Sequence, residues 1–282
     1  MKIIAHLATA IMFTLLSAAC SNATGANNTD MADTTSVKVE INTTLGSFTV
    51  LLYGDTPVHR DNFLKLASEG YYDNTLFHRV ISEFMVQAGD PTSKNAKPGQ
   101  HLGAGNPGYT LEAEFVYPKH FHKRGALAAA RTGDAMNPEK RSSGSQFYIV
   151  TGRKFSDGEL GQIEQNSLNR KMQATFNDLA RSRADEIRAL QQAGDTAGLN
   201  SLRESLIAQT EEIAGKLHKP LTDEQRQAYT TVGGSPHLDG DYTVFGEIVD
   251  GMDVIDKIEK VETDGADRPK EDIRILSMKV LK

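Results

Sequence analysis

Apolar and polar positions alternate in two short segments early in the chain. Residues 37–41 read Val-Lys-Val-Glu-Ile, and residues 48–53 repeat the pattern less strictly, with Gly46 between the two segments. Alternation with a period of two is typical of a strand that buries one face, and glycine suits a tight turn. The pattern therefore predicts a β-hairpin.

The pattern then changes to helical spacing. Thr56 and Pro57 are typical of an N-cap and of the first helical position, and Gly70 is typical of a helix end. Phe63 and the apolar residues around it are spaced to form one buried face. We expect a helix from Thr56 to Glu69.

Further apolar segments are short and lie between glycine-rich loops. They cover residues 84–86, 127–130, 147–150 and 243–245. Many short strands separated by turn signals are typical of a closed barrel or a sandwich. The pattern predicts a mainly β fold.

Residues 153–235 have a helical pattern instead. A capping box at Ser156 and Glu159 opens a long helical segment, which glycines interrupt at residues 194–198. A second helical segment follows, and another capping box opens a short third helix near residue 222. We expect an α-helical hairpin inserted into a β-rich domain that is formed by residues 37–152 and 236–282.

The N-terminus has the pattern of an export signal. Lys2 precedes an apolar run, residues 3–16, that is too short for a permanent membrane span, and small residues follow it. We expect a signal peptide over residues 1–19. Residues 20–36 are mostly small and polar, which predicts a flexible tether.

The single cysteine follows this signal directly. Ser-Ala-Ala-Cys at residues 17–20 resembles the lipobox of bacterial lipoproteins, in which the cysteine is lipidated and begins the mature protein. The resemblance implies a lipid anchor at Cys20, contact with a membrane through it, and a place in the bacterial cell envelope facing the periplasm. The alternatives are an anchor in a surface-facing membrane leaflet and plain secretion with a free Cys20.

Composition narrows the class of protein. The 282 residues carry a net charge of −6, which argues against nucleic-acid binding because phosphate contacts need a basic face. One cysteine excludes an intramolecular disulfide and a four-cysteine zinc site. The length allows one large domain or two ordinary ones.

Three motifs give the most specific signal. They are Phe-His-Arg-Val-Ile-Ser-Glu-Phe-Met-Val-Gln-Ala-Gly-Asp at 77–90, Gly-Ser-Gln-Phe-Tyr-Ile at 144–149, and Leu-Asp-Gly with Val-Phe-Gly at 238–246. In this order they resemble the signatures of cyclophilin-type peptidyl-prolyl cis-trans isomerases. The resemblance implies a cyclophilin-like eight-stranded antiparallel barrel capped by two helices, at Thr56–Glu69 and Met252–Ile258.

The chemistry of that family suits the residues in the motifs. An X-Pro bond isomerises slowly because amide resonance must be lost. A cationic donor near the imide and an apolar slot for the proline ring favour the twisted state, so no nucleophile, cofactor or metal ion is required. By resemblance Arg79 is the catalytic residue, a planar donor that stays charged at any working pH. Proline-containing polypeptides are the implied clients.

The resemblance also assigns substrate-binding residues position by position. Gln87 and Gln146 match polar residues that hold the substrate backbone and orient the arginine, and Ala130 matches a small residue of the peptide groove. The proline pocket is matched by Phe84, Met85, Tyr148 and Leu238, with Tyr148 where phenylalanine is common.

Three positions depart from the best-known eukaryotic pattern. His237 stands where tryptophan is usual, Arg131 where asparagine is usual, and Tyr242 where histidine is usual. The arginine and the pocket do not depend on these positions, so activity is still expected. Cyclosporin binding uses the tryptophan position in the family, and the resemblance gives no support for it here.

A group of histidines falls outside the motifs. His120 and His122, with His101, have no carboxylate at metal-ligand spacing. We therefore expect a solvated loop and no metal site.

Two functions are compatible with the sequence. One is a lipid-anchored isomerase that accelerates proline-limited folding of exported proteins, and the other is a proline-binding or chaperone module. Arg79 with both glutamines favours the enzyme, because binding alone needs only the apolar slot. The insertion is either a packed decoration or an arm that contacts clients or envelope partners. We expect it to affect the choice of client more than the chemistry.

Overall fold

The computed structural model describes residues 35–281. The predicted signal peptide, Cys20 and most of the predicted tether lie outside these residues. Among the helices of the described part, none is long and apolar enough to cross a bilayer.

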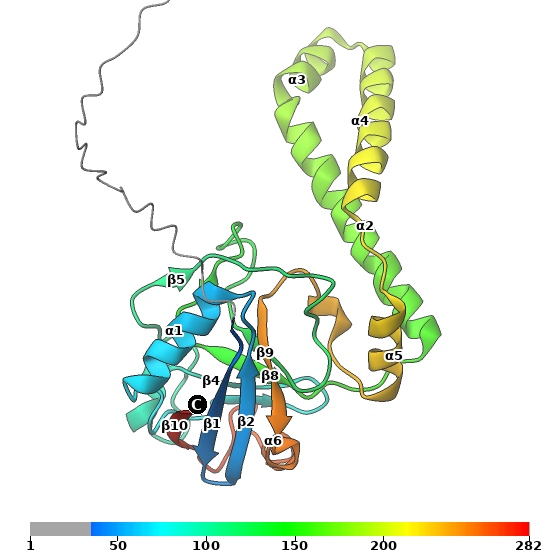
Figure 1. Ribbon diagram of the computed structural model, residues 1–282. Coiled ribbons are helices and arrows are strands. Elements are labelled where there is room, and N and C mark those ends of the chain that lie inside the picture. The colour runs from blue at the N-terminus through cyan, green and yellow to red at the C-terminus, as the bar shows by residue number, and fades with distance from the viewer. Residues whose placement is uncertain (1–34, 282) are drawn as a thin grey trace, which may run out of the picture. The chain divides into compact units, whose positions relative to one another are not determined.

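The chain combines short strands with two groups of helices (Figure 1). The strands are β1 (Val37–Thr43), β2 (Gly46–Leu52), β3 (Arg79–Ile81), β4 (Met85–Ala88), β5 (Thr110–Leu111), β6 (Ala126–Ala129), β7 (Ser142–Ser143), β8 (Phe147–Val150), β9 (Val244–Asp250) and β10 (Ile275–Leu281). The helices are α1 (Pro57–Ser68), α2 (Asp157–Ser182), α3 (Ala184–Ala193), α4 (Thr196–Leu217), α5 (Asp223–Thr231) and α6 (Met252–Glu259), with 3₁₀ turns η1 (Pro91–Asn95) and η2 (Pro236–Leu238).

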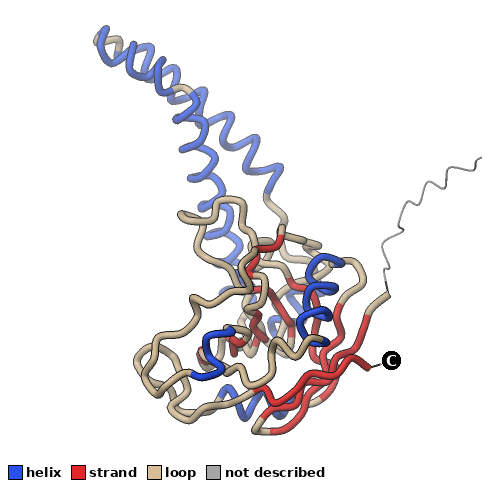
Figure 2. Tube along the Cα trace, turned by 90° about the vertical axis from the view of Figure 1, so that its left-hand side faces the viewer, coloured by secondary structure: helices blue, strands red, loops and turns tan. Residues whose placement is uncertain are grey.

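Eight strands form one antiparallel sheet in the order β10-β1-β2-β9-β6-β8-β4-β3. Figure 2 shows these strands curling together. The outer strands β3 and β10 do not pair along a ladder. Instead, the segments that precede them meet at the Leu76–Arg274 bridge, where the Phe77 N–H donates to the Ile273 carbonyl at 2.9 Å. The predicted mainly β fold, with one eight-stranded antiparallel sheet, is confirmed.

The core lies inside the curl of this sheet. Val39 and Ile41 of β1 are fully buried, while Glu40 between them is partly exposed, as the alternating pattern predicts. The predicted hairpin is present, with Val39 opposite Val50 of β2. The two helices that flank the sheet, α1 and α6, add buried side chains to the same core.

The start of α1 differs from its prediction in one respect. Thr56 is at the N-cap position, but its side chain makes no capping hydrogen bond. The carboxylate of Glu114 accepts from the backbone N–H groups of Val58 and His59 instead, at 3.0 and 2.9 Å. The helix end is therefore capped by a loop that is 55 residues away in sequence.

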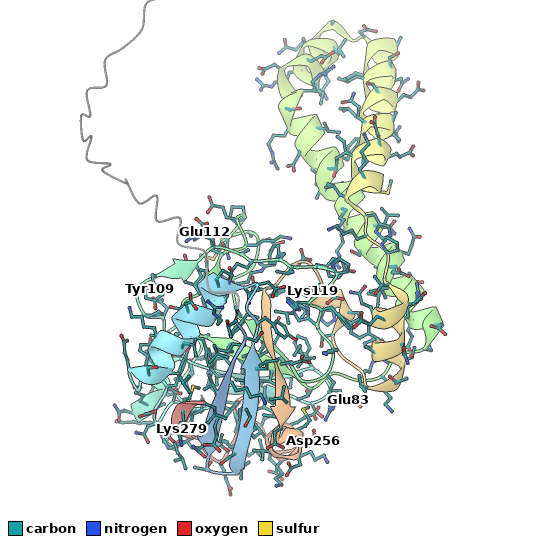
Figure 3. The ribbon with its side chains drawn as sticks, in the orientation of Figure 1. Glu83, Tyr109, Glu112, Lys119, Asp256 and Lys279 are labelled. Atoms are coloured by element: carbon teal, nitrogen blue, oxygen red, sulfur yellow. The ribbon has the colours of Figure 1, made fainter. Side chains whose placement is uncertain are left out.

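The predicted insertion contains α2 to α5. The capping boxes at Ser156 and at Thr222 both form, and Gly194 ends α3 in the left-handed conformation. One long first helix was expected, but the chain breaks at Arg183 into α2 and α3. Figure 3 shows the side chains of α2, α3 and α4 pointing outward along much of their length, and α3 buries no residue.

Candidate active site

One cavity of about 390 Å³ brings most of the predicted site together. Its walls come from β3, β4, β8 and η2, from the residues that follow β6, and from the loops at residues 99–103 and 264–268. Seven of the eight predicted catalytic and substrate-binding residues line it: Arg79, Phe84, Met85, Gln87, Ala130, Tyr148 and Leu238. The eighth, Gln146, is not among the lining residues but is hydrogen-bonded to Gln87.

Arg79 lies at the rim of this cavity because of its place in the sheet. The β3–β4 register puts it directly opposite Gln87. Its Nε is 3.4 Å from an oxygen of Asp267, and both side chains are 44% exposed. An exposed ion pair of this length is weak, so it orients the guanidinium group without locking it.

Two glutamines connect the floor of the cavity to the loop above it. Gln87 Nε2 donates to Gln146 Oε1 at 2.9 Å. Gln146 Nε2 in turn donates to the carbonyl oxygens of Gly103 and Gly105 at 2.9 and 2.7 Å. Because the amide of Gln146 is engaged at both its oxygen and its nitrogen, the orientation of Gln87 opposite the arginine is fixed.

Asp90 holds the same loop from its other side. Its carboxylate accepts from the Gly103 N–H at 2.5 Å, from the Gly105 N–H at 3.3 Å, and from Thr92. Burial by itself would raise the pKa of Asp90, but these hydrogen bonds favour the charged form and bring the pKa below its ordinary value. The loop is therefore tied to a buried carboxylate.

The floor of the cavity is apolar. Met85 and Tyr148 are 2% and 4% exposed and belong to one cluster of the core. Phe84, Ala130 and Leu238 are partly buried and pack against that cluster. A hydrophobic slot beside a guanidinium group suits a ring that carries no charge and no N–H donor, such as that of proline.

The three departures from the eukaryotic pattern lie close to this slot. The Arg131 guanidinium stacks over the Tyr242 ring at 4.3 Å, and its Nε donates to the Asp241 carbonyl at 2.9 Å. Arg131 is thus held by a ring and a backbone carbonyl, whereas Arg79 at the rim has the exposed, weaker pair with Asp267. His237 packs beside Phe84 with ring centroids 5.4 Å apart, and burial lowers its pKa.

The expectation of a solvated loop is wrong for His120 and His122, whereas His101 is exposed. The His120 side chain is 9% exposed and pairs with Asp55 at 2.7 Å, while His122 is 1% exposed and pairs with Asp239 at 2.9 Å. Their partners are 65 and 117 residues away, so local spacing carried no signal for them. Within residues 35–281 no cluster of three metal-ligating side chains is present.

Sequence reasoning assigned no role to two further residues of the cavity. His78 is 4% exposed, and burial lowers its pKa. Arg268 is 6% exposed, and its NH1 donates to the carbonyls of Lys97 and Gln100 at 2.9 and 2.8 Å. His78 lies inside the first motif, next to Arg79, so its place in the cavity could have been predicted from the motif. No local pattern in the sequence marks Arg268.

Comparison with known proteins places this chain in a family. The family model of the cyclophilin type peptidyl-prolyl cis-trans isomerase/CLD matches residues 37–196 and 213–280. A Staphylococcus aureus protein named as a peptidyl-prolyl cis-trans isomerase is 30% identical over 245 residues, covering 86% of this chain and 91% of its own length.

Two other relatives are similar over most of this chain. A Streptococcus pyogenes protein named as a bifunctional phosphatase/peptidyl-prolyl cis-trans isomerase is 34% identical, and the match covers 89% of this chain but 40% of that protein. The solved Cryptosporidium parvum cyclophilin type peptidyl-prolyl cis-trans isomerase shares the fold, with a TM-score of 0.50 at 21% identity, over 88% of this chain and 99% of that one. The chain belongs to the cyclophilin-type peptidyl-prolyl cis-trans isomerases and is an enzyme of that class.

Proposed function

We propose that Arg79 catalyses the isomerisation by donating a hydrogen bond to the imide while the proline ring occupies the apolar slot. The observation that carries this proposal is the position of a half-exposed guanidinium group at the rim of a buried hydrophobic floor. Loss of resonance makes the imide nitrogen pyramidal and basic, so a fixed cationic donor stabilises the twisted state more than the planar one. The reaction forms no covalent intermediate.

The remaining predicted residues have supporting roles in this proposal. Phe84, Met85, Tyr148 and Leu238 hold the proline ring, and Ala130 leaves room for the peptide. Gln87 and Gln146 hold the substrate backbone and orient Arg79. Their hydrogen-bonded chain to the loop at residues 103–105 supports this assignment.

The test of the mechanism is a protease-coupled assay on a short Ala-Pro peptide. Arg79→Ala should lower kcat/KM by about 100-fold, the size of effect seen when one transition-state donor is removed. Arg79→Lys should restore part of it, because lysine supplies the charge without the planar fork. Arg203→Ala, at an exposed arginine of α4, is the matched control and should keep the wild-type rate. Equal rates for Arg79→Ala and wild type would refute the assignment.

We further propose that the enzyme accelerates proline-limited folding of exported proteins at the bacterial cell envelope, facing the periplasm. The motif at residues 17–20 supports a lipid anchor at Cys20, and the run of apolar residues before it supports export. Radiolabelled palmitate should label the wild-type protein in bacteria and fail to label Cys20→Ala. Label retained by Cys20→Ala would contradict the anchor and leave the isomerase assignment unaffected.

A further inference from the structure

The hydroxyl group of Tyr148 needs a partner because the ring is buried. The side chain lines the cavity and is 4% exposed. A buried hydroxyl without a hydrogen bond is costly, and the apolar floor around it offers none. The partner is Nε2 of His122, which lies 2.9 Å from the Tyr148 oxygen, with the two rings nearly parallel at 13°.

The second nitrogen of His122 fixes the direction of this hydrogen bond. Nδ1 is 2.9 Å from an oxygen of Asp239, and the backbone N–H of His122 donates to the same oxygen at 2.9 Å. An ionised carboxylate only accepts, so Nδ1 carries the proton. In a neutral ring Nε2 is then the acceptor, and the Tyr148 hydroxyl donates to it.

The other oxygen of Asp239 is held by the helical insertion. It accepts from the Tyr229 hydroxyl at 2.7 Å and is 3.5 Å from Nε2 of Gln225. Both residues belong to α5 and are fully buried. Asp239 is next in sequence to Leu238, and Leu238 lines the cavity. A continuous chain of hydrogen bonds therefore runs from α5 through Asp239 and His122 to Tyr148.

The segment that carries His122 is itself fixed at both ends. At one end the His120 side chain, which is 9% exposed, has its Nε2 2.7 Å from an oxygen of Asp55. At the other end the Ser235 N–H, just past α5, donates to the His122 carbonyl at 2.8 Å. Neither the ring nor its backbone can shift without breaking several buried hydrogen bonds, which is the condition for transmitting position through a network.

We infer that the insertion sets the position of Tyr148 in the active site through Asp239 and His122. Tyr229, Asp239 and His122 are positioning residues, and the chain from α5 to Tyr148 is the Tyr229–Tyr148 relay. The inference rests on the proposed function, since it takes the cavity floor to be the proline pocket. It gives the insertion a role in the chemistry, in addition to any contact with clients.

The decisive experiment is a double-mutant cycle on the full chain. Tyr229→Phe and Tyr148→Phe each remove one hydroxyl and keep the ring, so the packing of α5 and of the pocket is retained. Tyr229→Phe should lower kcat/KM on the short Ala-Pro peptide about fivefold in wild type, and by less than about twofold in the Tyr148→Phe background. Equal effects of Tyr229→Phe in both backgrounds would overturn the relay.

A matched control separates the relay from the general stability of the insertion. Glu164 of α2 pairs with Arg226 of α5 and makes no contact with Asp239. Glu164→Gln removes this ion pair while Tyr229 keeps its hydrogen bond to Asp239, so it should leave kcat/KM unchanged. If Glu164→Gln lowers kcat/KM as much as Tyr229→Phe, the effect is one of stability and the relay is refuted.

A spectroscopic measurement tests the same geometry without an activity assay. In ¹⁵N-histidine NMR spectra His122, assigned by its loss in His122→Ala, should carry its proton on Nδ1. A proton on Nε2 alone would overturn the relay. Failure of the proposed function is distinguishable, because it would leave Arg79→Ala as active as wild type whatever the cycle shows.

Discussion

Asp90 connects the active-site cavity to the loop that covers it. It is fully buried, and its two oxygens accept from Thr92, Gly103 and Gly105. The loop therefore depends on a carboxylate that stays ionised inside the protein. Since hydrogen bonds hold its pKa below the ordinary value, folding favours the charged form of Asp90.

Replacing this carboxylate should destabilise the protein in a pH-dependent way. We expect Asp90→Asn to lower the free energy of unfolding at neutral pH by about 1–3 kcal/mol, because a buried N–H of the loop loses its acceptor. The stability that the carboxylate supplies is present above its unfolded pKa of about 4, and is lost as the pH falls through the lower folded pKa. Urea unfolding should show the difference from wild type shrinking as the pH is lowered below about 4.

An exposed carboxylate provides the comparison for this prediction. Asp185 on α3 is 95% exposed, and Asp185→Asn should change the free energy of unfolding by less than about 0.5 kcal/mol. If the difference in free energy of unfolding between Asp90→Asn and wild type stays the same from neutral to acid pH, the ionised form of Asp90 is not the source of the stability.

At the scale of single residues, the sequence predicted the location of a side chain where that residue lies in a motif. Most of the residues assigned by resemblance surround or support one cavity because the first two motifs fall on the neighbouring strands β3, β4 and β8. His122 was misassigned to a solvated loop because its partner Asp239 is 117 residues away. Pairs of this kind depend on the fold, and no spacing in the sequence encodes them.

Among the elements, α1 shows how a loop can complete a helix. Glu114 accepts from two backbone N–H groups at the helix start, and its Oε2 is 2.6 Å from Nδ1 of His59. Burial alone would raise the pKa of Glu114, but the hydrogen bonds from His59 and Val58 lower it. The charged carboxylate thus lies at the positive end of the helix dipole.

We therefore expect Glu114→Gln to destabilise the protein by about 1–2 kcal/mol, the usual size of an N-cap loss. Thr56→Val is the matched change at the position that the sequence marks as the cap. Its hydroxyl makes one long hydrogen bond, 3.4 Å to the Tyr53 carbonyl, so Thr56→Val should cost less than about 1 kcal/mol. Thermal unfolding measures both, and a larger loss for Thr56→Val would contradict the assignment of the cap.

Element boundaries were predictable where the local chemistry is sufficient. The capping boxes at Ser156 and Thr222 form because both partners lie within one turn. The break at Arg183 was not predicted, since neither glycine nor proline marks it. The apolar spacing continues across the break, and hydrophobic periodicity alone cannot distinguish one helix from two.

For the whole molecule, the main question is how far the insertion is separate from the barrel. Leu160 of α2 and Tyr229 of α5 are fully buried and share a small core with Phe121. The base of the insertion is therefore part of the folded domain. Farther along, Met172 and Phe176 of α2 line a shallow groove with Ile207 and Thr210 of α4, and only these helices contribute to it.

This division predicts different outcomes for two deletions. Removing residues 157–232 takes away Leu160 and Tyr229, and each buried apolar side chain contributes roughly 1.5–3 kcal/mol, so that variant should unfold at a lower temperature. Replacing residues 173–212 by a short Gly-Ser linker keeps the base. Because Lys171 Nζ donates to the Leu217 carbonyl at 3.3 Å, the two helices are close enough for such a linker.

The shortened variant should turn over the short Ala-Pro peptide within about twofold of the wild-type rate, because the removed residues touch neither the cavity nor the Tyr229–Tyr148 relay. If the outer part of the insertion selects clients, the same variant should accelerate proline-limited refolding of a whole protein less well than wild type. Loss of peptide turnover with the fold intact, checked by circular dichroism, would instead place a catalytic requirement in the outer helices. Unchanged rates on both substrates would remove client selection from the roles of this segment.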